Sequence, residues 1–219
     1  MRSSEGKADP MTPWIDQHGV YAAGGKRLLD AVIGAMALPL VGVVALGVGV
    51  AIKLDDGGPL FFEQERRGRY GVPFKMLKFR SMKIDAPDLR NPDSSTVASA
   101  SDWRVTRIGR FLRKTSIDEL PQLVNVFKGD MSLIGPRPNL TTTPLERLGG
   151  DELLRLSVRP GITGYNQAYF RNSSTLEQRY ANDCGYANRI TLLGDLRILA
   201  ATVTSVVAGK NLYSTVEKQ

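Results

Sequence analysis

The sequence predicts an α+β fold that is mostly helical, contains one β-hairpin and is held on a membrane by an N-terminal re-entrant helix. Three observations lead to this prediction. Residues 31–52 contain no charged side chain, two short apolar stretches then flank a glycine-containing turn, and the remaining apolar residues follow helical spacing. With 42% hydrophobic and 23% charged residues among 219, the composition is that of a globular chain and argues against disorder.

The composition restricts the chemistry that the chain can perform. The net charge of +7 points to an anionic partner, which on this evidence is a nucleic acid, an anionic lipid or a phosphorylated substrate. One cysteine, Cys184, excludes an internal disulfide, and one histidine, His18, argues against Ser-His-Asp catalysis and multi-histidine metal sites. Catalysis would therefore rest on carboxylates, lysine, arginine, hydroxyl groups or a metal bound by oxygen.

Residues 26–54 form the predicted membrane helix, and residues 1–25 are interpreted as a flexible polar lead. The apolar run would measure about 33 Å as a straight helix, close to the hydrocarbon thickness of a bilayer, so a buried core helix is disfavoured. Pro39 should kink it. Lys26 precedes the run and Lys53 follows it, so both flanks have cytoplasmic character, which favours a re-entrant helix over a spanning one.

The segment after the membrane helix predicts a β-hairpin. Residues 60–62 and 74–79 are short apolar stretches, and the glycine-containing residues 67–71 lie between them. Residues 85–101 are rich in Asp, Pro, Ser and Ala and are predicted to form a loop. Residues 55–219 are expected to form a single domain together with the membrane helix.

Helical spacing dominates the rest of the chain. Residues 106–127 predict a helix in two pieces, and further helices are expected over 145–156, 175–187 and 190–208. The last of these has a broad apolar face. It suits either a core helix, which is slightly favoured, or a helix that lies in the membrane interface.

Adjacent acidic residues, Asp118 and Glu119, form the sharpest local feature. Ser116 and Glu119 have the spacing of a capping box, so a helix is expected to begin here with both acids in its first turn. Acids in a first turn are often ordinary caps. The functional alternative is that an ionised Asp118 attacks phosphorus while the neighbouring carboxylate helps to hold Mg²⁺.

Basic residues surround this acid pair in the sequence. Arg137 lies between two prolines, which restrict its backbone and would suit a rigid bidentate grip on phosphate. The loop of residues 159–164 contains two glycines and is either a plain turn or a place where a ligand approaches the backbone closely. The other basic candidates near the acid pair are Lys78, Arg80 and Arg113.

Four stretches occur together and in order in this chain. They are Lys-Phe-Arg-Ser-Met at 78–82, the segment 106–123 with its Asp-Glu-Leu-Pro, the segment 129–138 ending in Gly-Pro-Arg-Pro, and Arg-Pro-Gly-Ile-Thr-Gly at 159–164. In these stretches the chain closely resembles the bacterial sugar transferase family, the monotopic phosphoglycosyl transferases. The likeness extends from about Lys26 to the C-terminal helix and is greatest to the short, catalytic-core-only subgroup.

The resemblance implies an enzyme at the cytoplasmic face of the bacterial inner membrane. It would move a phosphosugar from a UDP-sugar to undecaprenyl phosphate, giving undecaprenyl-diphosphate-sugar and UMP in the first membrane step of polysaccharide or glycoconjugate assembly. The transfer would pass through a covalent intermediate on Asp118, with assistance from Glu119 and with Mg²⁺ at this pair. Residues 55–219 would be the catalytic domain.

Further expectations follow from the same resemblance. The helix would break at Pro39, and interfacial amphipathic helices would hold the site at the inner leaflet. Leu38 stands where many members have serine, and residues 165–169 depart from the usual family sequence in a region that touches the sugar. The substrate-binding residues are expected to be Lys78, Arg80, Arg113, Arg137, Arg159 and Gly161.

Two other functions compete with this hypothesis. One is a non-catalytic membrane scaffold of the same fold, which would be expected to lack the acid pair or the phosphate arginines, yet all of them are present. The other is a nucleic-acid binder, for which Trp103 beside Arg104 offers little support, so no nucleic acid is expected. A homodimer is left open, and the short subgroup favours an N-acetylated aminosugar donor.

Overall fold

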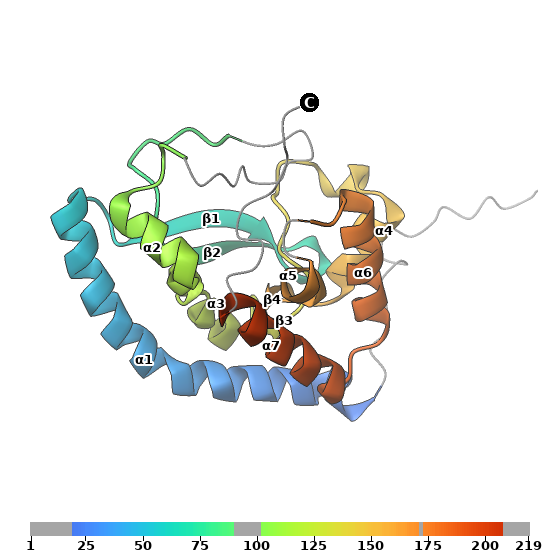
Figure 1. Cartoon of the computed structure of the whole chain (residues 1–219). Coiled ribbons are helices and arrows are strands. Elements are labelled where there is room, and N and C mark those ends of the chain that lie inside the picture. Colours follow the sequence, from blue (N-terminus) through green and yellow to red (C-terminus); the bar gives the residue numbers. More distant parts are fainter. Residues whose placement is uncertain (1–18, 90–101, 171–172, 208–219) are drawn as a thin grey trace, which may run out of the picture.

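The longest element of the structure is an apolar helix that runs along one side of the domain (Figure 1). The computed structural model describes residues 19–89, 102–170 and 173–207. The α-helices are α1 Lys26–Asp55, α2 Arg107–Thr115, α3 Gln122–Lys128, α4 Gly150–Leu154, α5 Tyr165–Tyr169, α6 Leu176–Asn188 and α7 Leu192–Val207. The strands are β1 Phe61–Arg67, β2 Pro73–Phe79, β3 Ser132–Ile134 and β4 Gly161–Thr163. This mostly helical architecture with a short antiparallel hairpin confirms the predicted mixture of elements.

Helix α1 is continuous through Pro39, and Figure 1 shows that its axis bends partway along its length. Within the described residues it is the one helix long and apolar enough to cross a membrane, and 17% of its most apolar window is buried. A core helix would be far more buried, so that alternative is wrong. The re-entrant arrangement stays a prediction. Large exposed side chains recur every three or four residues along one face, at Leu28, Val32, Met36, Leu40, Val43, Leu46, Val50 and Leu54.

Both ends of α1 are tied to the same domain. At the N-terminal end, the Nζ of Lys26 lies 2.6 Å from the Oδ2 of Asp195 in α7. At the C-terminal end, Asp55 accepts a 3.1 Å hydrogen bond from the backbone N–H of Ile108 in α2. Between these points the inner face of α1 packs on α3, where Gly34 lies against Phe127. Near its C-terminal end α1 meets the hairpin and α2, and Ile52 joins the hydrophobic core there. The helix therefore follows the surface of the domain along its length.

The predicted hairpin is confirmed. Strands β1 and β2 are antiparallel, with Phe61 opposite Phe79 and Arg67 opposite Pro73. Side chains on directly opposed residues of a sheet point to the same face. This register therefore puts Arg66 on the same face as Lys78, which matters for the site described below.

The predicted two-piece helix of residues 106–127 is confirmed as α2 and α3, but the capping box between them is wrong. Ser116 is in the left-handed conformation, with φ of 58°, and ends α2 through its N–H to the carbonyl of Arg113. Asp118 and Glu119 lie in a separate 3₁₀ turn, η3 (Ile117–Glu119), and α3 begins only after Pro121. Because the Glu119 side chain pairs with Lys78, it does not reach back to the Ser116 backbone.

A short parallel pair joins the remaining segments. Ser132 of β3 pairs with Gly161 of β4, and Ile134 pairs with Thr163. This pairing brings the segment of residues 135–138 beside the loop of residues 159–164. The helix predicted over 145–156 is instead a series of short turns, η4 (Leu145–Arg147), α4 and η5 (Arg155–Ser157), since two glycines interrupt it.

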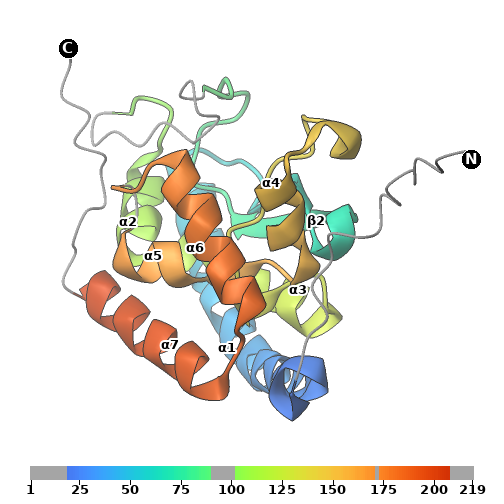
Figure 2. The same cartoon turned by 90° about the vertical axis from the view of Figure 1, so that its right-hand side faces the viewer.

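The last two predicted helices are confirmed as α6 and α7, which follow one another closely in Figure 2. On α7, Ile198 is buried against Ile134, whereas Leu193, Leu196 and Val203 are about half exposed. The core interpretation is confirmed for one face of this helix, and the membrane-interface interpretation of the exposed face stays a prediction. Of the predicted lead, residues 1–18 lie outside the described residues, and Tyr21–Gly25 form a π-helical turn, η1, that leads into α1. Most of the predicted loop, 90–101, also lies outside them.

Candidate active site

The acid pair lies where three elements meet. Asp118 and Glu119 occupy η3, which packs against β2 and follows α2 directly. The Asp118 side chain is buried, at 8% exposure, and no described residue donates a hydrogen bond to its carboxylate. Glu119 accepts a 2.7 Å bond from the Nζ of Lys78 on β2. The two neighbouring carboxylates thus differ sharply in their local pairing.

This difference sets the two carboxylates apart in acidity. Burial raises the pKa of Asp118 to about 6, and the charge of Glu119 adds to this, while Lys78, Arg113 and Arg137 act in the opposite direction. Burial also acts to raise the pKa of Glu119, but Lys78 and Arg137 outweigh it and hold that pKa below its usual range. At neutral pH both groups are ionised, and Asp118 is the more basic and less well stabilised of the two.

Helix α2 carries Arg113 toward the acid pair. A Cβ at Gly109 would lie 1.9 Å from the carbonyl oxygen of Ser81, so only glycine allows α2 to approach the end of β2 this closely. This close approach lets the Nε of Arg113 donate a 2.9 Å hydrogen bond to the Oγ of Ser81. The contact fixes the arginine within electrostatic reach of Asp118.

A small cavity opens beside Glu119 and Lys78. Gly161 lines it at the start of β4, and a Cβ there would lie 2.1 Å from the backbone nitrogen of Gly135. Because that space is filled by backbone, glycine is required for the two loops to meet at this wall. The full lining is Arg66, Met76, Lys78, Glu119, Gln122, Arg137, Pro138, Gly161 and Ile162.

Two of the predicted substrate-binding residues lie elsewhere. Arg80 is 7% exposed, and its guanidinium pairs with Asp56 and donates to the carbonyl of Pro59 at 2.8 Å. Arg159 donates from Nε to the carbonyl of Gly129 at 2.9 Å, at the opposite end of α3 from the acid pair. The sequence motifs that contain Arg80 and Arg159 did not indicate that these side chains bond to other parts of the protein. The structure brings together Asp118, Glu119, Lys78, Arg113, Arg137 and Gly161, but neither Arg80 nor Arg159.

The family of the chain follows from its similarity to known proteins. A family model described as bacterial sugar transferase matches residues 21–209, which is most of the chain. The chain belongs to the bacterial sugar transferase family. The match begins in η1 and ends just beyond α7, so it includes the apolar helix as well as the acid pair.

Individual relatives of this sugar transferase cover most of the chain. A UDP-glucose:undecaprenyl-phosphate glucose-1-phosphate transferase of Caulobacter vibrioides is 41% identical over 197 residues, covering 86% of this chain and 72% of that protein. An uncharacterized sugar transferase of Bacillus subtilis, EpsL, is 38% identical over 190 residues, covering 87% and 91%. The galactosyl transferase CpsE of Streptococcus agalactiae serotype III is 40% identical over 192 residues, covering 84% of this chain and 42% of its own length.

Two residues of the sugar transferase site were missed from the sequence. Arg66 lines the cavity and acts electrostatically on Glu119, and Gln122 lines it from the first turn of α3. The hairpin alternation could have identified Arg66, since the register places it on the Lys78 face. Gln122 follows the acid pair by three residues, but its direction depends on the unexpected 3₁₀ turn before α3.

The acid pair offers two carboxylates as possible donors to a metal ion. Among the described residues no group of three or more His, Cys, Asp or Glu side chains is arranged to hold a metal. Mg²⁺ commonly uses one or two protein carboxylates and completes its shell with water and phosphate oxygens. The donor set of Asp118 and Glu119 therefore fits a magnesium ion that arrives with a phosphorylated substrate.

Proposed function

We propose that this chain is a phosphoglycosyl transferase that moves a phosphosugar from a UDP-sugar to undecaprenyl phosphate. The observation that carries the proposal is the charge of the site. Four cationic side chains act on two carboxylates, of which Glu119 is bonded to a lysine and Asp118 is not. These cations are Lys78, Arg66, Arg113 and Arg137. Such an excess of positive charge suits a diphosphate substrate, and one of the two carboxylates, that of Asp118, accepts no hydrogen bond from the part of the chain that the structure describes.

In the first step, an oxygen of ionised Asp118 attacks the phosphorus that carries the sugar. An aspartyl-phosphate bond forms, the bond from this phosphorus to the bridging oxygen breaks, and UMP leaves with the electron pair. A buried carboxylate with a pKa of about 6 is ionised at neutral pH and is less well stabilised than a solvated one, which favours its use as a nucleophile. Lys78 and Arg137 would offset the negative charge that develops on the phosphate oxygens.

In the second step, a phosphate oxygen of undecaprenyl phosphate attacks the same phosphorus and releases the Asp118 carboxylate. The product is undecaprenyl-diphosphate-sugar, and the enzyme returns to its starting state. Asp118 and Glu119 would hold Mg²⁺, which when bound supplies positive charge to the donor diphosphate. Dividing the transfer in two lets UMP leave before the lipid acceptor reacts.

For the donor we propose a UDP-hexose. The names of two relatives specify glucose and galactose, at 41% and 40% identity, and this favours a hexose over the N-acetylated aminosugar expected from the short subgroup. Residues 165–169 lie in α5, directly after the loop that contains Gly161. We assign sugar discrimination to this region.

For the membrane helix we propose a re-entrant arrangement at the cytoplasmic face of the inner membrane. A straight helix of 30 residues would measure about 45 Å and would carry its two ends to opposite sides of a bilayer. Here Lys26 at one end and Asp55 at the other both bond to the same domain. The exposed apolar face of α1 would enter the inner leaflet, together with that of α7.

A UMP-release assay tests the proposal. Detergent-purified protein is given undecaprenyl phosphate, Mg²⁺ and in turn UDP-glucose, UDP-galactose and UDP-N-acetylglucosamine. We expect UMP release with one of the hexose donors, dependent on the lipid acceptor for multiple turnovers and stopped by excess chelator. A scaffold would release no UMP from any donor, and a preference for UDP-N-acetylglucosamine would overturn only the assignment of the sugar.

A further inference from the structure

Arg137 lies in a segment whose backbone has few N–H groups with which to form hydrogen bonds. Its neighbours Pro136 and Pro138 have no N–H, so the segment can be anchored mainly through its carbonyl groups. Two buried arginines provide the anchors. Arg155 donates from NH2 to the carbonyl of Arg137 at 2.9 Å, and Arg66 donates from NH1 to the carbonyl of Pro138 at 3.1 Å. The exposed guanidinium of Arg137 is therefore aimed by contacts to its own main chain.

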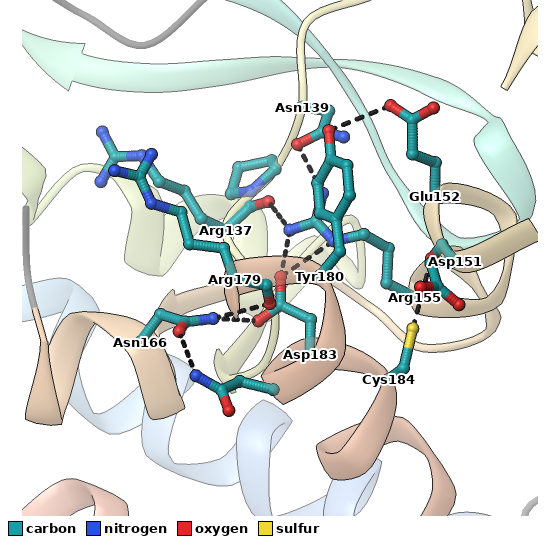
Figure 3. Close-up of polar contacts among 12 residues, drawn as sticks. Arg137, Asn139, Asp151, Glu152, Arg155, Asn166, Arg179, Tyr180, Asp183 and Cys184 are labelled. Carbon is teal, nitrogen blue, oxygen red and sulfur yellow. Dashed lines mark hydrogen bonds and ion pairs between the residues drawn. The ribbon is translucent and has the colours of Figure 1, made fainter. Parts of the chain in front are cut away.

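Arg155 itself is fixed by a buried network behind the site (Figure 3). Its side chain is 3% exposed and donates from Nε to the Oδ2 of Asp183 at 2.9 Å. A second bond runs from its NH1 to the Oδ1 of Asn139, on the far side of Pro138. The ring of Tyr180 lies 5.1 Å from the guanidinium carbon. Every nitrogen of this guanidinium thus has a defined partner, and two of the partners flank Pro138.

Asp183 extends the network to a second segment of the site. Its Oδ1 accepts a 2.8 Å bond from the Nδ2 of Asn166 in α5, two residues after Gly164. One carboxylate on α6 therefore joins Arg155, and through it Arg137, to the region proposed to contact the sugar. Figure 3 shows the side chain of Arg137 directed away from this network, while its backbone faces it.

We propose that Arg155 is a positioning residue for Arg137, with Asp183 as its fixed anchor. Arg155 does not reach the substrate; it holds the carbonyl of Arg137 so that the guanidinium faces the donor diphosphate. This inference rests on the proposed function, because the diphosphate is what Arg137 would bind. A buried ion pair contributes little net stability compared with apolar side chains of the same size, so a role in geometry accounts for it better than stability does.

The first test replaces Arg155 with lysine. Lysine keeps a positive charge beside Asp183 but cannot bridge the carbonyl of Arg137 and the side chain of Asn139 at the same time. We expect kcat/KM for the UDP-sugar to fall about 10- to 100-fold, mainly through a higher donor KM, as is usual when the support of a binding residue is lost. The KM for undecaprenyl phosphate should change much less.

A second variant separates positioning from folding. Arg155→Met with Asp183→Leu replaces the pair with apolar side chains, which buried sites often tolerate without loss of stability. We expect a folded protein with a donor KM raised as in Arg155→Lys. Its Tm should lie a few degrees below that of the unmodified chain, because the carbonyl of Arg137 and the side chains of Asn139 and Asn166 each lose a partner. Asp195→Asn is the matched control, since it breaks the buried Lys26–Asp195 pair away from Arg137. It should lower Tm and leave the donor KM unchanged.

A double-mutant cycle tests whether Arg155 acts through Arg137. In an Arg137→Gln background, Arg155→Lys should have no further effect on donor KM, because the residue that it positions is already gone. If the two effects multiply instead, Arg155 acts independently of Arg137 and the inference is overturned. It is equally overturned if both Arg155 variants fold and keep the normal donor KM. Failure of the proposed function is distinct, because the unmodified chain would then release no UMP.

Discussion

Asp118 and Asp183 are both buried aspartates within reach of arginines, yet their surroundings differ. Asp183 is 3% exposed and accepts hydrogen bonds from Arg155 and Asn166. Asp118 is 8% exposed, and none of the described residues donates a hydrogen bond to it, although Arg113 and Arg137 act on it electrostatically. The same residue type is thus fully paired in one place and left open in the other.

The comparison distinguishes an aspartate that holds structure from one that is available for chemistry. Buried polar groups in proteins are almost always paired, so an unpaired buried carboxylate beside cations marks a site where a substrate or ion completes the bonding. The paired network behind the site keeps its geometry fixed. The open carboxylate in front can then react without first giving up a hydrogen bond.

The largest expected effect comes from removing the open carboxylate. Asp118→Asn should reduce UMP release to background, because an amide cannot form the aspartyl-phosphate. Glu119→Gln should retain measurable activity, since that residue assists but does not attack. Both are read in the UMP-release assay with the preferred donor. Normal turnover by Asp118→Asn would show that Asp118 is not the reacting carboxylate, and the distinction between a reactive Asp118 and a structural Asp183 would then fail.

Stability should respond in opposite directions at the two aspartates. Burial raises the pKa of Asp183 as well, but here the carboxylate is bonded to Arg155, and Asp183→Asn would leave that guanidinium buried without its counter-charge. We expect a cost of about 3–5 kcal/mol, which lowers Tm by roughly 10 °C. Asp118→Asn should instead stabilise the protein at pH 8, by up to about 3 kcal/mol, because the raised pKa makes ionisation unfavourable in the folded state.

The sign of the Asp118 effect can be checked by pH. A pKa raised from 3.8 to about 6 means that the stability cost of ionisation is absent below pH 3.8 and complete above pH 6. Thermal unfolding of the two variants and the unmodified chain at pH 8 and pH 4 measures this. A stabilising effect of Asp118→Asn that persisted at pH 4 would contradict the account.

Two of the arginines predicted to bind substrate, Arg137 and Arg159, should respond differently to substitution. Arg137→Gln should lower kcat/KM about 100-fold, because it removes a charge that faces the donor. Arg159→Gln should change kcat/KM less than about threefold and should act mainly on Tm, since its guanidinium binds the carbonyl of Gly129. Steady-state kinetics on both variants test this, and equal losses would place Arg159 at the substrate.

The last prediction concerns the pH dependence of the unmodified chain, in which no residue is changed. Because Asp118 must be ionised to attack, kcat/KM for the donor should rise about tenfold per pH unit up to about pH 6 and then level off. The profile is measured with saturating acceptor in a buffer series of constant ionic strength. An acidic limb near pH 4 would mean that the reacting carboxylate is a well-paired one.

The sequence was sufficient for the elements with strong local signals. The hairpin, the apolar helix and the helices α6 and α7 follow from spacing and turn residues, and the acid pair was identified by its motif. Ser116 was misinterpreted because it adopts the left-handed conformation that ends α2 and does not cap the start of a following helix. Capping patterns describe local preference, and here the Lys78–Glu119 pair outweighs it.

The cationic residues show most clearly where sequence alone is insufficient. Arg80 and Arg137 both lie in motifs beside the acid pair, but Asp56 binds the first and no described residue pairs with the guanidinium of the second. Long side chains reach partners far along the chain, so their roles are set by tertiary contacts. The network of Arg155 and Asp183, 28 residues apart, left no local pattern for the same reason.

The intact mass of the donor-treated protein tests the central claim most directly. The purified chain is incubated with Mg²⁺ and the preferred UDP-sugar, without lipid acceptor, and is then denatured in acid and weighed. We expect a gain equal to one sugar phosphate, lost on addition of undecaprenyl phosphate and absent from Asp118→Asn. If product accumulates under matched conditions while no such adduct ever forms, Asp118 is not the nucleophile.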